Sequence, residues 1–224
     1  MAVRDALADP RSALAEAYQS LCSTLRLASP GGFPPSLSIT SAQPGGGKST
    51  TALAMARNQA RLGFRVLLID ADLRAPSLHT MVGADNRVGL STLLTGAARL
   101  EDAAQAGEGS NLFLLPSGPM PPNPAELLAG NRFATVIADA MAGFDIVICD
   151  GPPVMGLADA PAIGAATGAT VLIVEAGRTT RSQVRDARRR LEMSGRRILG
   201  VVLTRFDPPR GAYGYGYDRH RQSA

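Results

Sequence analysis

An α/β fold with a mainly parallel sheet, flanked by helices on both faces, is predicted for this chain of 224 residues. First, several short runs such as 64–69 and 144–150 are predominantly apolar, which is typical of parallel strands buried on both faces. Second, segments with helical periodicity and glycine- or proline-rich breaks separate these runs. Third, one predicted strand leads directly into a glycine-rich turn, and two others end in aspartate. The length suits one domain, which we place at residues 1–206.

An amphipathic helix is expected near the start of the chain, over about residues 10–27. Asp9 is the expected N-cap, because its side chain can accept from free backbone N–H groups, and Pro10 suits the first turn. Leucines and one tyrosine then recur every three or four residues, as they do on one face of a helix. They are Leu14, Tyr18, Leu21 and Leu25. Residues 30–35, rich in proline and glycine, end this helix.

Strands and helices alternate along the rest of the chain. A helix over about 48–62 ends at Gly63, short helical pieces occupy 77–110, and another helix begins at Ala125. An arginine-rich helix is expected between the last two strands, and its arginines most simply form a solvated face. The expected strands are 36–40, 64–69, 111–115, 144–150, 169–174 and 197–203.

The segment Ala42–Ser49 has the spacing of a phosphate-binding loop: a small residue, four spacers, then Gly-Lys-Ser. Its three glycines permit positive φ and leave room for backbone N–H groups to gather around an anion. Lys48, which is the only lysine in the chain, can bind the β- and γ-phosphates, and the Ser49 hydroxyl can bind Mg²⁺. This loop predicts the P-loop NTPase fold. The expected nucleotide-binding residues are Pro44, Gly45, Gly46, Gly47, Lys48, Ser49 and Thr50.

Carboxylates stand at the ends of two predicted strands. Asp70 and Asp72 follow strand 64–69, and their side chains project toward the same side. Asp150 ends strand 144–150. Because ligands of parallel sheets bind at the carboxyl ends of the strands, we expect all three groups near the phosphate loop. A carboxylate such as Asp150 suits Mg²⁺, which it can hold directly or through water.

Residues 207–224 are predicted to form a flexible tail, because they have turn chemistry and no apolar period. Three of the four tyrosines alternate with glycine here, a spacing that core tyrosines do not have. Glycine allows each ring to move freely, as a segment that enters an active site must. The alternative is a low-complexity end without this role. The expected phosphate acceptors are Tyr213, Tyr215 and Tyr217.

Composition argues against several other classes of protein. Cys22 and Cys149 form no CxxC pair or metal-binding cluster, which suits a reducing compartment. The first residues lack the apolar core of a signal peptide. The most membrane-like window, 154–176, contains Asp159 and Glu175 and is not a spanning helix, so we expect a soluble protein. The net charge of +4 is modest for this length, and no nucleic-acid partner is expected.

Together these motifs resemble the bacterial tyrosine kinases (BY-kinases), the cytoplasmic kinases of capsule and exopolysaccharide export systems. The resemblance extends over nearly the whole chain. Residues 67–74 match the family's Asp-x-Asp-x-Arg motif, 146–150 match its Walker B strand, and 115–128 match a further family segment. The phosphate loop is widely shared, whereas the Asp-x-Asp-x-Arg motif combined with terminal tyrosines is far more specific.

The resemblance implies an ATP-dependent protein tyrosine autokinase that regulates polysaccharide polymerisation and export. It implies that Lys48 and the loop hold the phosphates of ATP, while Ser49, Asp72 and Asp150 organise Mg²⁺. Asp70 is the expected acceptor of the tyrosine proton, although Asp70 and Asp72 could exchange these roles. The catalytic residues implied in this way are Lys48, Asp70 and Asp72.

The family's known partners are implied as well. The expected activator is the cytoplasmic segment of a transmembrane polysaccharide co-polymerase, either a separate chain or one fused upstream. The kinase would then lie in the cytoplasm, at the inner face of the cell membrane through this partner. Copies of the chain would self-associate to phosphorylate each other, and a cognate tyrosine phosphatase would reverse the reaction.

Two departures from the family pattern affect these expectations. The family's first helix usually carries Glu-x-x-Arg-x-x-Arg, which joins subunits into a ring, but the matching residues here are Glu16, Gln19 and Cys22. We therefore expect a ring that is weaker, differently built or dependent on a partner. Thr204 also stands where related ATPases often have an asparagine near the adenine.

Two alternative functions stay open. A MinD- or ParA-type ATPase has the same fold and hydrolyses ATP without a tyrosine acceptor. Those proteins carry a lysine five residues before the loop lysine, whereas this chain has Gln43 there, and they have no use for a Gly-Tyr tail. The other alternative is a nucleotide-binding assembly subunit without kinase activity. The intact Lys48, Asp70, Asp72 and Asp150 argue against it.

Overall fold

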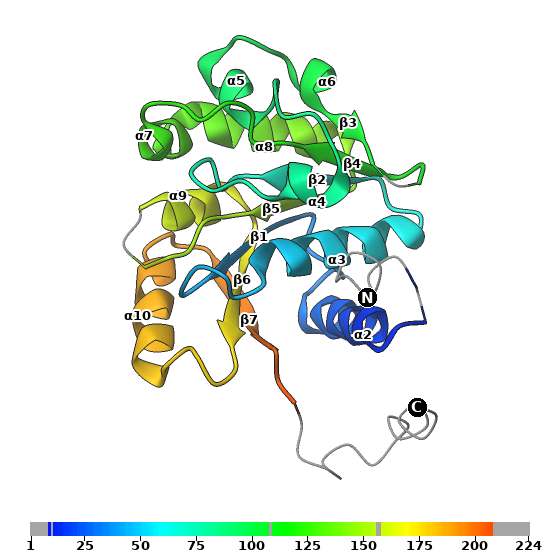
Figure 1. Ribbon diagram of the computed structural model, residues 1–224, viewed down its shortest axis with the longest axis vertical. Coiled ribbons are helices and arrows are strands. Elements are labelled where there is room, and N and C mark those ends of the chain that lie inside the picture. Colours follow the sequence, from blue (N-terminus) through cyan, green and yellow to red (C-terminus); the bar gives the residue numbers. More distant parts are fainter. Residues whose placement is uncertain (1–8, 10, 108, 156–157, 208–224) are drawn as a thin grey trace.

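The chain folds around a seven-stranded sheet with the strand order β3-β4-β2-β5-β1-β6-β7 (Figure 1). The computed structural model describes residues 9, 11–107, 109–155 and 158–207. Neighbouring strands are parallel except β3 and β4, which pair antiparallel at one edge. The predicted α/β fold is confirmed. The strands are β1 Ser36–Ser41, β2 Val66–Asp70, β3 Gln105–Ala106, β4 Leu112–Leu115, β5 Ile146–Asp150, β6 Ala169–Glu175 and β7 Arg197–Thr204.

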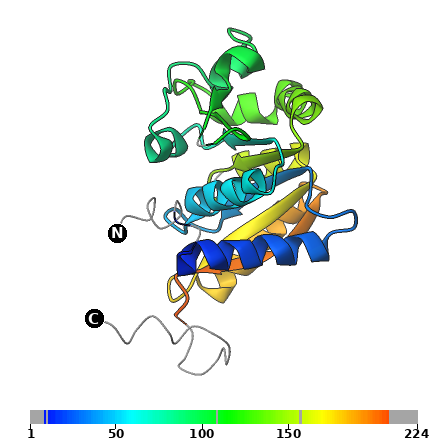
Figure 2. The same cartoon turned by 90° about the vertical axis from the view of Figure 1, so that its right-hand side faces the viewer.

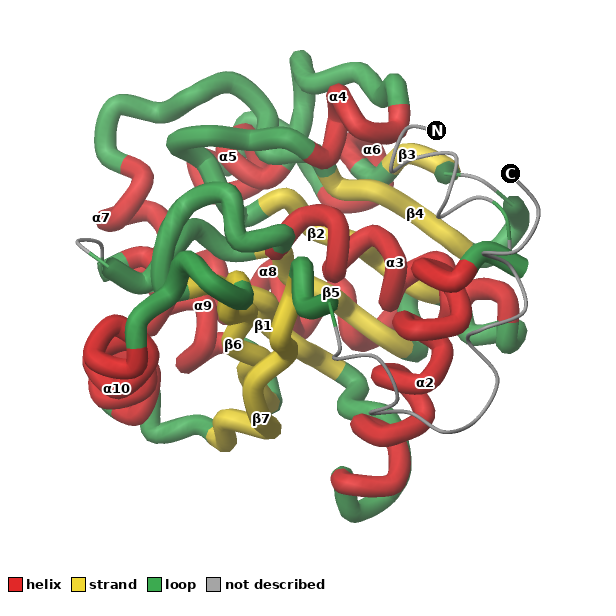
Figure 3. Tube along the Cα trace, turned by 60° about the horizontal axis from the view of Figure 1, so that its bottom comes forward, coloured by secondary structure: helices red, strands yellow, loops and turns green. Residues whose placement is uncertain are grey.

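Helices cover both faces of this sheet. Helices α2 and α3 lie side by side on one face, and α8, α9 and α10 lie on the other (Figures 2 and 3). The helices are α2 Ala13–Ala28, α3 Lys48–Arg61, α4 Leu78–Val82, α5 Leu90–Thr95, α6 Leu100–Ala103, α7 Pro124–Ala129, α8 Asn131–Gly143, α9 Asp159–Ala166 and α10 Arg181–Glu192. None of those nine, which are the helices of the described residues, is long and apolar enough to cross a bilayer.

Strand β2 is apolar from Val66 to Ile69 because helices cover both of its faces. Val66 and Leu68 pack into the core under α2 and α3, whereas Leu67 and Ile69 pack into the core under α8. Successive side chains of a strand point to opposite faces, so a strand covered on both sides needs apolar residues at every position. The same reasoning applies to β5, which lies next to β2 in the centre of the sheet.

The start of the N-terminal helix differs from the prediction. Helix α2 begins at Ala13, and its N-cap is Ser12, whose Oγ accepts a hydrogen bond from the backbone N–H of Ala15 at 3.1 Å. Asp9 instead accepts from the backbone N–H of Arg11 at 2.9 Å, one turn too early to cap the helix. Both residues are good caps, and only the backbone geometry decides between them.

The structure differs from the predicted elements at three further places. The short strand β3 pairs with β4 at the edge, and two residues are too few to leave a periodic pattern. The helix expected from Ala125 is divided at Gly130 into α7 and α8, because the backbone of Gly130 is extended. Helix α9 occupies part of the window 154–176, whose small residues gave no clear helical period.

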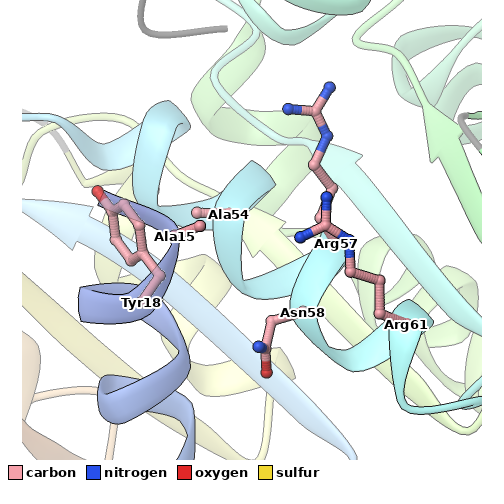
Figure 4. A pocket seen from close by; sticks show the side chains of 6 residues that line it. All are labelled: Ala15, Tyr18, Ala54, Arg57, Asn58 and Arg61. Carbon is pink, nitrogen blue, oxygen red and sulfur yellow. The ribbon is translucent and has the colours of Figure 1, made fainter. Parts of the chain in front are cut away.

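The contact between α2 and α3 combines apolar packing with polar pairs, including Arg26 Nη2, which donates to Gln59 Oε1 at 3.2 Å. The Tyr18 hydroxyl lies 3.1 Å from Thr51 Oγ1, and Cys22 on the same helix face is buried. Figure 4 shows Ala15 and Tyr18 of α2 facing Ala54 of α3 across a pocket of about 10 Å³. A pocket of this size has room for about one water molecule. It is therefore no candidate for a nucleotide site.

Gly89, the N-cap of α5, offers a test of how α5 packs against the segment that follows β4. A Cβ on Gly89 would lie 2.2 Å from the carbonyl oxygen of Pro116 and 2.3 Å from the backbone nitrogen of Gly118. Neither backbone can withdraw easily, so we expect Gly89→Ala to lower the free energy of unfolding by about 2 kcal/mol or more. Urea denaturation measures this change.

The matched control is Gly143→Ala at the end of α8, where a Cβ would meet nothing within 4 Å. Alanine is favoured over glycine in a helix, so this variant should be equally stable or more stable by up to about 1 kcal/mol. Equal stability of the two variants would contradict the packing described around Gly89.

Candidate nucleotide-binding site

The phosphate loop joins the end of β1 to the start of α3. Gly45 has φ +79° and Gly47 has φ +93°, both in the left-handed region that side chains other than glycine rarely adopt. Gly47 is also the N-cap of α3, so the helix begins at Lys48 with its free N–H groups directed toward the loop. This arrangement of backbone N–H groups and helix N-terminus suits a phosphate group.

Thr204 supports this loop from the end of the edge strand β7. Its Oγ1 donates to the carbonyl oxygen of Gly46 at 2.8 Å and lies 3.3 Å from the carbonyl oxygen of Val174. The hydroxyl is therefore directed toward the loop backbone. The loop is held between its own helix and the last two strands of the sheet.

Lys48 meets the first of the predicted carboxylates. Its Nζ lies 3.8 Å from Asp72 Oδ2, and both residues are largely buried, with exposed fractions of 9% and 5%. Burial raises the pKa of Asp72, and the charge of Lys48 opposes that rise. The pair lies where a phosphate bound to the loop would place its terminal oxygens within reach of the ammonium group.

Asp70 is completely buried at the end of β2, with an exposed fraction of 0%. Its Oδ2 accepts from the backbone N–H groups of Ser77 at 3.0 Å and Leu78 at 2.9 Å, at the start of α4. Its Oδ1 has no hydrogen-bond partner among the described residues. Burial raises the pKa of this carboxyl to about 6, although the two N–H groups lower it. The Ser77 hydroxyl, in turn, lies 2.9 Å from that of Ser49.

Asp150 ends β5, directly opposite Asp70 in the sheet register. It is also buried, and neither carboxylate oxygen has a hydrogen-bond partner in the described part of the chain. Burial raises its pKa to about 8, and the charge of Lys48 opposes this rise. The Ser49 hydroxyl is close enough to lower the pKa too, although it reaches neither oxygen with hydrogen-bond geometry. A buried carboxylate with two bare oxygens is costly unless a cation or donor joins it.

These bare oxygens fit a magnesium ion. Within the described ranges, no three His, Cys, Asp or Glu side chains are close enough to hold a metal by themselves. Mg²⁺ usually takes only one or two carboxylates and completes its shell with waters and substrate phosphates. The residues predicted for this role are Ser49, Asp72 and Asp150. Of the two carboxylates, Asp150 has both oxygens unpartnered within the described ranges, whereas Asp72 Oδ1 accepts from the backbone N–H of Ala75 at 3.1 Å.

Sequence reasoning missed Arg178, which lies beside the loop, and Arg205, which shares its carboxylate partner. Glu175, at the end of β6, binds both Arg178 and Arg205. The Nη1 atom of Arg178 lies 3.2 Å from the position that a Cβ of Gly45 would occupy. Arg178 is 133 positions after Gly45 and Arg205 is 160 positions after it, and no motif in the sequence connects either residue to the loop.

The positions of the family's ring motif and one large cleft are not part of this site. Glu16 and Gln19 are exposed on α2, but Cys22, the third position of the family's ring motif, is buried with an exposed fraction of 2%. A cleft of about 960 Å³ opens near Phe113 and Phe144 and includes none of the predicted site residues. The predicted acceptors Tyr213, Tyr215 and Tyr217 lie outside the described residues.

Known proteins resemble this chain over most of its length. Residues 37–214 match the CobQ/CobB/MinD/ParA nucleotide binding domain. The tyrosine-protein kinase YwqD of Bacillus subtilis is 39% identical over 88% of this chain and 84% of that protein. The tyrosine-protein kinase wzc of Salmonella typhimurium is 32% identical over 95% of this chain, which matches 30% of the longer protein.

Solved structures agree with these relatives. The kinase domain of the Escherichia coli tyrosine kinase ETK has a TM-score of 0.82 at 32% identity, covering 93% of this chain and 82% of that one. The septum site-determining protein MinD of Pyrococcus horikoshii, complexed with Mg-ADP, is more distant: its TM-score is 0.65 at 25% identity, over 75% of this chain and 69% of that one. The P-loop NTPase fold is thereby confirmed. As its similarity to YwqD, wzc and ETK shows, this chain belongs to the bacterial tyrosine-protein kinases, enzymes of the CobQ/CobB/MinD/ParA nucleotide-binding class.

Proposed function

We propose that this chain is an ATP-dependent tyrosine autokinase that phosphorylates the tyrosines of its own C-terminal segment. The observation that supports this most directly is the group of residues around Lys48. One ammonium group lies 3.8 Å from Asp72, and two further buried carboxylates end the neighbouring strands β2 and β5. Phosphoryl transfer requires mainly positioning and charge neutralisation, and such a group can provide both.

The loop and Lys48 bind the phosphates of ATP in this proposal. Backbone N–H groups of residues 44–50 surround the β-phosphate, and Lys48 contacts the β- and γ-phosphates. Ser49, Asp72 and Asp150 hold magnesium directly or through water. When bound, the ion neutralises charge on the β- and γ-phosphate oxygens.

The acceptor tyrosine loses its proton to a carboxylate in the same step. Its hydroxyl oxygen forms a bond to the γ-phosphorus, the bond from that phosphorus to the β-bridging oxygen breaks, and ADP leaves with the electron pair. Asp70 is our candidate for the proton acceptor, because its Oδ1 is unpartnered within the described ranges and burial raises its pKa to about 6. Asp72 is the alternative, because Asp70 is completely buried whereas Asp72 retains an exposed fraction of 5%.

The cellular role follows from the family. We propose that the kinase acts in capsule or exopolysaccharide production, in the cytoplasm at the inner membrane face. Its activator would be the cytoplasmic segment of a membrane-spanning co-polymerase. The length of wzc, of which this chain matches 30%, supports such a partner, because in that relative further segments belong to the same polypeptide. Self-association and a tyrosine phosphatase complete the proposed cycle.

Mapping of phosphorylated residues tests this proposal. After incubation with Mg-ATP and the activator segment, mass spectrometry should find phosphate on Tyr213, Tyr215 or Tyr217. The triple variant Tyr213→Phe, Tyr215→Phe and Tyr217→Phe should lose it, because phenylalanine has no hydroxyl to attack the phosphate.

The control is Tyr18→Phe, which removes the one tyrosine outside the tail. Tyr18 is partly buried and hydrogen-bonded to Thr51, so this variant should retain full phosphorylation. Phosphate on serine would favour a different transferase activity. ATP hydrolysis without any phosphotyrosine would favour a MinD- or ParA-type ATPase, and the absence of both reactions would favour a non-enzymatic assembly subunit.

A further inference from the structure

Arg74 and Asp159 form an ion pair at the same edge of the sheet as the nucleotide site. Arg74 Nε donates to Asp159 Oδ2 at 2.8 Å. Arg74 is the final residue of the Asp-x-Asp-x-Arg motif, in the segment that follows β2, and Asp159 is the first residue of α9. The proposed function gives neither residue a role.

Asp159 is built into the interior. Its exposed fraction is 1%, and its Oδ1 has no hydrogen-bond partner among the residues that the structure describes. Its position in the first turn of α9 places the charge beside free backbone N–H groups of the helix, where a carboxylate is stabilised. Only one of its two oxygens is used by Arg74, so the pair does not reach the bidentate geometry that gives such pairs their full strength.

Arg74 uses only part of its guanidinium group in this contact. Its side chain is 37% exposed, and within the described ranges no hydrogen bond involves either terminal nitrogen. An arginine has five N–H donors in a planar fork, and four of them belong to these two nitrogens. Asp159 therefore holds the side chain by its inner nitrogen and leaves the outer edge available for an anion.

Arg74 lies close to the nucleotide site. Arg74 is two residues beyond Asp72, whose Oδ2 lies 3.8 Å from Lys48 Nζ. The Oδ1 atom of Asp72 accepts a hydrogen bond from the backbone N–H of Ala75 at 3.1 Å, so the segment that carries Arg74 folds back onto Asp72. An anion that contacts Lys48 beside Asp72 therefore lies near a second cation.

A purely structural role explains this pair poorly. An ion pair with one partner at the surface adds little to the stability of a fold, whereas burying a carboxylate with one unpartnered oxygen is costly. Arg188 and Glu192 show the ordinary alternative: the same type of contact, Nε to carboxylate at 2.7 Å, with both side chains exposed on α10. A buried carboxylate oxygen without a partner is an exception in folded proteins, and a catalytic role is one explanation for it.

We propose that Arg74 is a catalytic residue whose terminal nitrogens donate to the phosphate group that is being transferred, and that Asp159 is its positioning residue. The proposal rests on the phosphotransferase function proposed above. Negative charge on the equatorial oxygens of the transferred group must be stabilised in the transition state, and an arginine in this position is suited to that task. The anion it recognises is the γ-phosphate of a nucleoside triphosphate.

The first experiment measures binding to a mimic of the transferred group and requires no tyrosine acceptor. The affinity of the full chain for Mg-ADP is measured with and without aluminium fluoride, which occupies the position of the γ-phosphate. For the native chain, aluminium fluoride should tighten binding. For Arg74→Ala, the affinity for Mg-ADP alone should stay within about twofold, while the tightening should fall by about tenfold or more.

The second experiment separates contact from positioning by kinetics. Arg74→Ala should lower kcat by about 100-fold with little change in KM for ATP, because the contact forms mainly in the transition state. Arg74→Lys should recover little of this loss, since one ammonium group cannot bind Asp159 and a phosphate as the guanidinium fork does. Asp159→Asn keeps an oxygen acceptor and should lower kcat by about tenfold.

A double variant tests whether Asp159 acts through Arg74. Once Arg74 is alanine, Asp159→Asn should cause almost no further loss of kcat, because two residues that act together are not additive. The matched control is Arg188→Ala, which removes the equivalent contact on α10 and should leave kcat and the response to aluminium fluoride unchanged. Thermal unfolding of each variant shows that the fold is retained.

The outcomes for this proposal and for the proposed function differ. Native kinetics and native tightening by aluminium fluoride in both Arg74→Ala and Arg74→Lys would overturn the role of Arg74 while the autokinase function stands. An additive effect of the double variant would overturn the positioning role of Asp159. If the native chain forms no phosphotyrosine but Arg74→Ala loses its response to aluminium fluoride, the autokinase proposal fails and the contact with the transferred phosphate is supported.

Discussion

Lys48→Met is expected to abolish the formation of phosphotyrosine, with a loss of at least about 100-fold in rate. Methionine has a similar length but no charge, so the loop keeps its shape while the phosphates lose their ammonium partner. No other lysine exists in the chain to replace it. Quantitative detection of phosphotyrosine after incubation with Mg-ATP and the activator segment measures the effect.

The conservative variant Lys48→Arg serves as the comparison. Lys48 is 9% exposed and lies between the loop and Asp72, so the larger, forked guanidinium should not take up the same position. We expect this variant to keep the charge but to remain severely impaired. Activity close to native in either variant would contradict the central role given to Lys48.

Asp150→Asn is expected to have the second largest effect. The asparagine has the same shape, but it removes the negative charge of a carboxylate whose two oxygens have no hydrogen-bond partner in the described part of the chain. We expect magnesium-dependent ATP binding to weaken by about tenfold and phosphotyrosine formation to fall by about 100-fold. Titration calorimetry with and without Mg²⁺, together with phosphotyrosine detection, measures the two effects.

The stability of this variant provides an internal control. Burying a neutral amide costs less than burying an unpaired carboxylate, so the magnesium-free Asp150→Asn chain should unfold at a temperature no lower than the native chain. Asp145→Asn is the matched substitution immediately before the same strand, where Oδ2 accepts from the backbone N–H of Arg65. Asparagine can still accept that bond, and native activity is expected. A loss of activity equal to that of Asp150→Asn would show that charge near β5, rather than the site, is responsible.

The sequence alone determined the class of fold and the chemistry of the loop. Both follow from local properties of the chain. A strand covered on both faces must be apolar along its buried length, as β2 is from Val66 to Ile69. A backbone that surrounds phosphate requires glycine at positions such as Gly45 and Gly47. Asp9 and Ser12 are both good N-caps and lie three positions apart, and the local pattern did not show which of them caps the first helix.

The tertiary structure alone decided which distant residues meet. The sequence predicted Asp70 and Asp150 at the same edge of the sheet, but only the pairing of β2 with β5 placed them directly opposite each other. Thr204 reached the backbone of the loop because β7 lies beside β6. The contact of Arg74 with Asp159 depends on the same placement of α9. Periodicity and motifs report the environment of each residue along the chain, whereas these contacts arise from the packing of separate elements, so no local signal in the sequence could predict them.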